Sequence, residues 1–127
     1  MELDWIRRHC LSLPGTTEDV QWESLLFRIG GKIYALAALE ESASAALCFK
    51  CTPEEFAELV EIEGLIQAPY FARKQWIAMT TLDALPRAET RRRINRSYEL
   101  VKAKLPKKIR DTLPEGKPHQ SSSSSSY

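Results

Sequence analysis

The feature that most constrains this chain is a change in hydrophobic periodicity from three or four residues to two. Within residues 21–50 apolar side chains occupy alternate positions, as in Leu25, Phe27 and Ile29, and the pair Gly30-Gly31 interrupts the run. Alternation with period two is typical of half-buried β-strands, and a glycine pair between two such runs indicates a tight hairpin. We therefore predict an antiparallel meander in this segment.

The same alternation predicts which strand residues face a core. Residues 74–80 are included because they have the composition of a further strand. Successive side chains of a strand point to opposite faces, so the apolar parity is assigned to the inside. The predicted inward residues are Leu25, Phe27, Ile29, Ile33, Ala35, Ala37, Leu47, Phe49, Ile77 and Met79.

Apolar side chains at three- and four-residue spacing predict three helices. The first covers residues 3–13 and ends at Pro14-Gly15. The second begins at Thr52-Pro53-Glu54-Glu55, where the threonine and the second glutamate form a capping box. The third runs from near Pro86 to Pro106, because proline cannot continue a helix.

The segments between these elements complete the predicted order. Residues 16–19 are polar and are predicted as a turn, and residues 65–71 are predicted as a packed loop. The order α-β-β-β-α-β-α predicts an α+β fold in which an antiparallel sheet carries helices on one face. Residues 1–110 form a single domain in this prediction, and the Gly-, Pro- and Ser-rich segment 111–127 forms a disordered tail.

Composition and apolar run length exclude several classes of protein. With 43% hydrophobic and 28% charged residues, the chain matches ordinary globular proteins and differs from wholly disordered ones. No apolar run approaches the ~20 residues that a membrane-spanning helix needs. The acidic, amphipathic start differs from a secretory signal, and three cysteines without a disulfide-like spacing suit a reducing compartment. We therefore expect a cytoplasmic protein without a membrane partner.

The charges are separated along the chain although the formal net charge is only +1. Residues 1–85 hold 7 Lys/Arg against 13 Asp/Glu, whereas residues 86–110 hold 10 Lys/Arg against 2 Glu. A molecule with this asymmetry can bind polyanions at its basic pole. The auxiliary basic candidates in the terminal segment are Arg92, Arg96, Lys104, Lys107 and Lys108.

The sheet face that the helices leave uncovered carries the main candidate site. The strand positions that alternate with the inward residues are predicted to face outward, and they include cations and large aromatic side chains. No carboxylate occupies an outward position of the predicted strands. Cations neutralise phosphates, and an aromatic ring stacks on a base with a free energy of about 1–3 kcal/mol. By parity alone, a solvated lysine-rich face explains the pattern equally well. The candidate residues are Arg28, Lys32, Tyr34, Lys50, Lys74 and Trp76.

Catalytic and metal chemistry have no comparable support. Cys48 and Cys51 lie at the end of a predicted strand, where side chains three positions apart point to opposite faces, so their spacing indicates neither a zinc site nor a redox pair. The glutamates of residues 53–63 lie on the outer side of a helix, and metal binding there is a weaker alternative function. No nucleophile triad, phosphate-binding loop or carboxylate pair stands out, so we expect neither enzyme activity nor a cofactor.

Several short motifs resemble the MmcQ/YjbR family of small bacterial proteins. The resemblance covers about residues 1–105 and rests on the order and spacing of the motifs. The motifs are Leu11-Ser12-Leu13-Pro14-Gly15 with Glu18, Phe27-Arg28-Ile29-Gly30-Gly31-Lys32-Ile33-Tyr34-Ala35, Lys50-Cys51-Thr52-Pro53, Ala68-Pro69-Tyr70, Lys74-Gln75-Trp76 and Ser97-Tyr98.

The resemblance implies a CyaY-like fold, which is a two-layer α/β sandwich. It also implies DNA binding through two hairpin wings, which correspond here to the turns at 30–32 and 40–44. The family's positions at Lys50, Lys74 and Trp76 coincide with the outward face. Nucleic-acid binding, to DNA in the first instance, is therefore the leading hypothesis. The alternative is a protein-interaction module that docks a partner through the Trp76 face, since frataxin-type proteins of this fold dock protein partners on the outer sheet surface.

Overall fold

The structure is a computed structural model that describes residues 2–40, 45–68 and 75–113. The strands form one six-stranded sheet in the order β1-β2-β3-β4-β6-β5, and all neighbouring strands are antiparallel. The elements along the chain are α1 (Glu2–Leu11), β1 (Thr16–Gln21), β2 (Ser24–Ile29), β3 (Lys32–Ala38), β4 (Leu47–Lys50), α2 (Pro53–Leu59), β5 (Leu65–Gln67), β6 (Trp76–Met79), α3 (Arg87–Ala103) and α4 (Lys107–Arg110).

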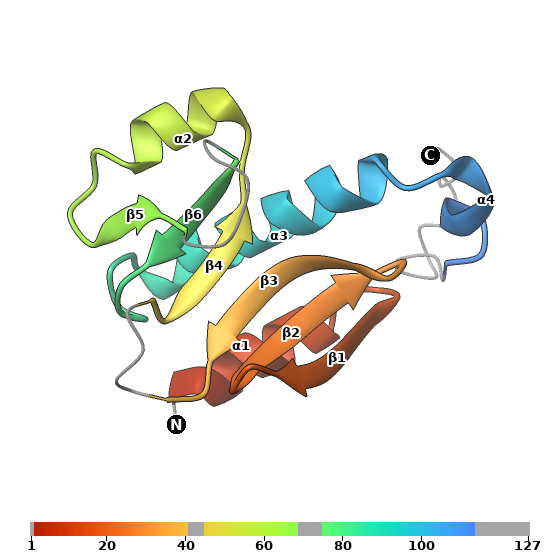
Figure 1. The fold of residues 1–127 in the computed structure, drawn as a ribbon, viewed down its shortest axis with the longest axis horizontal. Coiled ribbons are helices and arrows are strands. Elements are labelled where there is room, and N and C mark those ends of the chain that lie inside the picture. Colours follow the sequence, from red (N-terminus) through yellow and green to blue (C-terminus); the bar gives the residue numbers. More distant parts are fainter. Residues whose placement is uncertain (1, 41–44, 69–74, 114–127) are drawn as a thin grey trace.

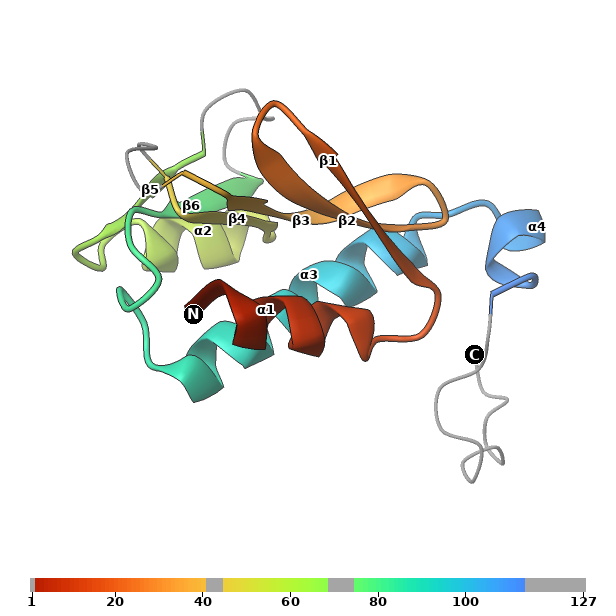
Figure 2. The same cartoon turned by 90° about the horizontal axis from the view of Figure 1, so that it is seen from below.

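The molecule has two layers, with α1, α2 and α3 on one side of the sheet (Figure 1, Figure 2). The core between the layers holds the inward residues of β2, β4 and β6 that alternation predicts. The buried stripe of the long helix, Ile94, Tyr98, Val101 and Leu105, is also confirmed. The predicted α+β fold, an antiparallel sheet with helices on one face, is therefore confirmed. None of the helices in the described residues is long and apolar enough to span a membrane.

Two strands form where the sequence pattern predicts a turn and a loop. Residues 16–19, predicted as a turn, begin β1, which pairs with β2 along its full length. All six β1 side chains are exposed or half-buried, so the strand has no apolar alternation that could reveal it. Residues 65–67 likewise form β5, a short edge strand.

A β-bulge in β3 changes which of its side chains face the core. Phe27 of β2 pairs with Ala35, but the next residue, Arg28, pairs with Ile33, so Tyr34 is the extra residue of the bulge. Tyr34 points into the core, and Ile33 packs on the opposite face, the reverse of the prediction for both. Lys32, predicted to face outward, pairs with the core residue Ile29 and so lies on the helix side of the sheet, at the exposed end of the hairpin. An extra residue inverts the parity of every position on one side of it, which period-two reasoning cannot anticipate.

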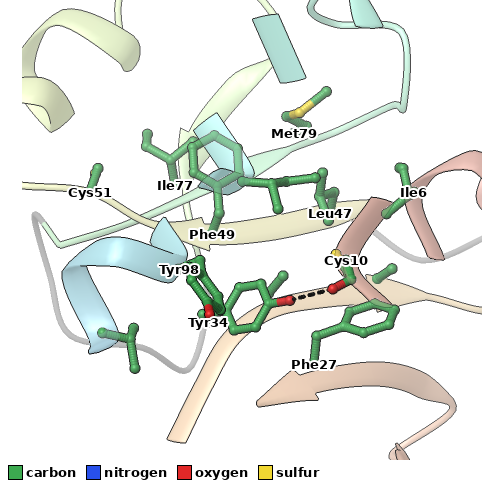
Figure 3. Packing of buried hydrophobic residues seen from close by; sticks show 14 of the residues in the cluster. Ile6, Cys10, Phe27, Tyr34, Leu47, Phe49, Cys51, Ile77, Met79 and Tyr98 are labelled. Carbon is green, nitrogen blue, oxygen red and sulfur yellow. Dashed lines mark hydrogen bonds between the residues drawn. The ribbon is translucent and has the colours of Figure 1, made fainter. Parts of the chain in front are cut away.

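The buried Tyr34 ties three elements together (Figure 3). Its hydroxyl donates a hydrogen bond to the Cys10 carbonyl oxygen at 3.2 Å and lies 2.8 Å from the Thr16 Oγ1 atom. Its ring meets that of Tyr98 edge-on, with centroids 5.3 Å apart. Burial is the main reason that the pKa of Tyr34 is raised. The prediction that Tyr34 offers an outward stacking surface is therefore wrong.

Strands β3 and β4 separate beyond the pair Ala35–Phe49, where a serine of α3 takes over their hydrogen bonding. The Ser97 Oγ atom accepts a hydrogen bond from the Lys50 N–H at 2.8 Å and donates one to the Tyr34 carbonyl at 2.6 Å. In a continued antiparallel ladder Tyr34 and Lys50 would be the next pair. The hydroxyl thus replaces a direct strand-to-strand contact, and it does so in a fully buried position.

The Ser97→Ala variant should lower the free energy of unfolding by about 1–3 kcal/mol, because it leaves a buried N–H and a buried carbonyl without their partner. Urea unfolding followed by circular dichroism measures the change. Ser12→Ala removes an exposed hydroxyl that bonds the His9 carbonyl, and it should cost about 0.5 kcal/mol or less. A Ser97→Ala protein as stable as the Ser12→Ala control would contradict this account.

The predicted Gly30-Gly31 turn joins β2 to β3, and its two residues have different surroundings. Both have positive φ, +59° and +84°, as a two-residue hairpin turn requires. A Cβ atom at Gly30 would lie 2.6 Å from a methyl carbon of Leu105, whereas one at Gly31 would meet nothing within 4 Å. Only the first glycine is therefore required by packing as well as by backbone geometry.

Gly30→Ala should destabilise the protein more than Gly31→Ala, by about 1 kcal/mol or more, because the two share the backbone cost and only the first crowds Leu105. The comparison needs only the urea unfolding midpoints of the two variants and the parent protein. Equal losses in the two variants would show that the turn does not pack against the end of α3 as described.

Candidate functional site

A hollow of about 520 Å³ lies where β3 leaves β4. Figure 1 shows β3 curving away from β4, with α3 behind the space between them. The sheet and the C-terminal end of α3 both contribute to its lining, so the two layers of the fold meet there. Four lining residues are cations, and none of those that the structure describes is acidic. The lining of this basic hollow consists of Arg28, Gly31, Lys32, Ile33, Lys50, Trp76, Val101, Lys104 and Leu105.

Lys50 and Trp76 form one wall of the basic hollow. They are direct cross-strand partners in the β4–β6 ladder, and the Lys50 Nζ atom lies 5.7 Å from the indole centroid. The same Nζ donates a hydrogen bond to the Gln75 Oε1 atom at 3.2 Å. Trp76 belongs to a cluster on the helix-free side, as parity predicts, but it is only 8% exposed. It therefore supports the lysine and does not offer a free face on which a base could stack.

The charge on Lys50 is held in an unfavourable position. Burial lowers the pKa of the Lys50 ammonium, and the nearby charge of Lys104 lowers it further. Two cations pressed together in a partly desolvated hollow favour the approach of an anion, which relieves the repulsion between them. The electrostatic preference of the site is thus for a negatively charged group between these two lysines.

The other two cations sit on the β2–β3 hairpin. Arg28 lies 3.6 Å from the Asp19 carboxylate and donates to the Gly31 carbonyl oxygen at 3.3 Å. Asp19 belongs to β1, the strand that was not predicted, so the sequence pattern missed this acid on the sheet. Among the described residues neither Lys32 nor Lys104 forms an ion pair. Three of the four cations of the hollow therefore keep their charge uncompensated by a carboxylate within that part of the chain.

The structure brings together four of the six predicted site residues, Arg28, Lys32, Lys50 and Trp76. Tyr34 is in the core. Lys74, most of the 40–44 turn and the tail beyond residue 113 lie outside the described residues. The sequence gives no sign that Val101 and Leu105 line the hollow, because they belong to the apolar stripe that α3 buries elsewhere.

The auxiliary basic residues divide between the hollow and other surfaces. Lys104 alone among them lines the hollow. Arg92 pairs with Glu89 at 3.0 Å, Arg96 with Glu55 at 2.8 Å, and Lys107 with Asp111 at 3.1 Å. Lys108 is exposed on α4. Three of these five auxiliary cations are therefore paired with carboxylates away from the hollow.

The acidic helix and the cysteines show no converging chemistry. Glu55 completes the predicted capping box with Thr52 and also binds Arg96, which uses both of its carboxylate oxygens. No group of three or more metal-ligating side chains occurs in the described part of the chain. Cys48 and Cys51 lie in clusters on opposite faces of the sheet, and burial raises their pKa values to about 12 and about 11. Both thiols are protonated at neutral pH and are poor nucleophiles.

Comparisons with known proteins agree with this fold. A Deinococcus radiodurans protein with a DUF419 domain superimposes with a TM-score of 0.76 at 25% identity, covering 86% of this chain and 85% of that one. A Pseudomonas syringae protein of solved structure shows the same fold with a TM-score of 0.54 at 24% identity, covering 67% and 86%. No curated protein matches the sequence. The YjbR family model matches residues 11–100, and the chain belongs to the YjbR family.

Proposed function

We propose that this protein binds nucleic acid, DNA in the first instance, through the basic hollow. The observation that carries the proposal is the meeting of Arg28, Lys32, Lys50 and Lys104 around one concavity whose described lining has no acid. Phosphate groups are the polyanionic ligands that such a constellation suits, because each lysine or arginine contact releases a counterion from the nucleic acid. The family resemblance points to the same function, with Lys50 and Trp76 among its motif positions.

The position of Lys104 supports the proposal further. Lys104 directly follows α3 on the helical layer, whereas the other three cations lie on strands. Because β3 and β4 diverge, the end of α3 is accessible from the helix-free side, and the two sets of charges meet. A single stretch of phosphate backbone can therefore contact both layers of the fold at once.

The Lys50→Ala/Lys104→Ala double variant should lose most nucleic-acid affinity. Four phosphate contacts predict that the logarithm of the association constant falls with the logarithm of salt concentration with a slope of about −3.6, and removal of two contacts predicts a slope of about −1.8. Fluorescence anisotropy of a labelled duplex oligonucleotide between about 50 and 200 mM salt measures both slopes.

The matched control is Arg92→Ala/Lys108→Ala, which removes the same charge outside the hollow and should leave the slope unchanged. An equal loss in this control would show that binding follows net charge and not the hollow. Salt-independent or undetectable binding by the parent protein would remove the proposed function.

A second candidate function, docking of a protein partner, is favoured by a different tryptophan. Trp22 is 75% exposed at the tip of the β1–β2 hairpin, and both turn residues, Trp22 and Glu23, have positive φ, 52° and 58°. This conformation costs an L-residue about 1–2 kcal/mol, and strained backbone occurs preferentially at functional sites. Glu40 lies beside Glu23, and the hydrogen bond and charge of Glu23 raise the pKa of the Glu40 carboxyl group. A cationic side chain of a partner would relieve the repulsion between these two carboxylates.

The Trp22→Asn/Glu23→Gly variant should raise the free energy of unfolding by about 1 kcal/mol, because Asn-Gly adopts this turn without strain. Urea unfolding measures the gain. The same variant should lose any protein partner that the parent retains after nuclease treatment. Unchanged stability would show that the turn carries no strain, and unchanged retention of the partner would exclude the hairpin tip as its docking site.

A further inference from the structure

We infer that the basic hollow accepts a single unpaired nucleotide of a strand, with its phosphate at the cationic rim and its base against an apolar floor. This inference rests on the proposed function and specifies the form of nucleic acid that the site recognises. It follows from the shape of the hollow, from the distribution of polar and apolar groups in its lining, and from the rigidity of its wall.

The shape of the hollow favours a single nucleotide over the convex backbone of a duplex. A volume of about 520 Å³ lies within the range of roughly 300–1,000 Å³ typical of small-molecule sites. One nucleoside monophosphate fits a concavity of this size. The backbone of a rigid duplex, which is convex, can reach only the rim.

The lining separates into two chemical zones. The four cations are long side chains that can place their charged groups at the rim, whereas Ile33, Val101 and Leu105 provide apolar surface between them. A phosphate group can pair with the cations of the rim but makes no use of the apolar floor. The apolar floor gains a partner only if a base leaves its stack and turns inward. This costs little in a single strand, whereas in a duplex the base must also leave its pair. The floor therefore discriminates between the two forms, while the rim does not.

The wall of the hollow is held in place before any ligand binds. Ser97 bonds the Lys50 backbone N–H, the β4–β6 ladder pairs Lys50 with Trp76, and the indole lies under the ammonium group. A site whose charged group is already positioned and partly desolvated loses little entropy when a phosphate arrives. Trp76 thus acts as a positioning residue for Lys50, which differs from the stacking role that the sequence predicted for it.

The test compares a labelled twelve-residue thymidine strand with its duplex at the same low salt. We expect the single strand to bind at least 10-fold more tightly. Val101→Thr, which nearly preserves size and charge, should weaken single-strand binding about 3-fold or more and leave duplex binding unchanged. The control Lys104→Ala should weaken both forms, because a rim charge serves either.

A nuclear magnetic resonance titration locates the base independently of protein stability. Thymidine monophosphate should shift the Val101 methyl resonances, whereas inorganic phosphate at equal concentration should shift resonances of the cationic rim, such as the Lys50 amide, and leave the Val101 methyl groups unshifted. Duplex binding as tight as single-strand binding, with the same loss in Lys104→Ala, would overturn the inference while the proposed function stands. Failure of both forms to bind would remove the proposed function itself.

Discussion

The hydroxyl group of Ser97 between β3 and β4 is the interaction on which the rest of the site depends. A sheet that continued its ladder past Ala35 and Phe49 would close the space between these strands. The serine satisfies the Lys50 N–H and the Tyr34 carbonyl from the helical layer, so the strands can separate without leaving buried backbone groups unpaired. One side chain of α3 thereby allows an opening in the sheet and places Lys50 at its edge.

The bulge and the Ser97 hydrogen bond both act on the backbone of Tyr34. The bulge turns the Tyr34 side chain into the core, where its hydroxyl donates to the Cys10 carbonyl and its ring meets that of Tyr98. This anchors the backbone whose carbonyl accepts the hydrogen bond from the Ser97 hydroxyl. Elsewhere on α3, Arg92, Arg93 and Arg96 pair with Glu89 or Glu55. Among the described residues, by contrast, no carboxylate pairs with Lys32, Lys50 or Lys104 of the hollow.

Much of the fold follows from local rules, and the misses share one cause. Alternation identifies the inward residues of β2, β4 and β6, and the capping box at Thr52 places the start of α2. The polar edge strand β1 is missed by the pattern because neither of its faces is apolar. Ile33 is assigned to the wrong face because the bulge at Tyr34 lies between it and the regularly paired part of β3. Hydrophobic pattern reports burial, so it is silent wherever an element has no buried face or departs from regular pleating.

The two tryptophans show why the candidate site needed the structure. Parity assigns Trp76 to the helix-free side correctly. A residue on that side is not necessarily exposed, however, and the Trp76 ring is nearly covered, with Lys50 extending over it. The exposed ring is that of Trp22, which lies in a turn, where hydrophobic periodicity predicts neither burial nor exposure. The same distinction applies to the cations, since Lys104 joins the strand residues only because the sheet opens in front of α3. Sequence spacing thus selects the residue types of a site, whereas irregular backbone decides which of them meet.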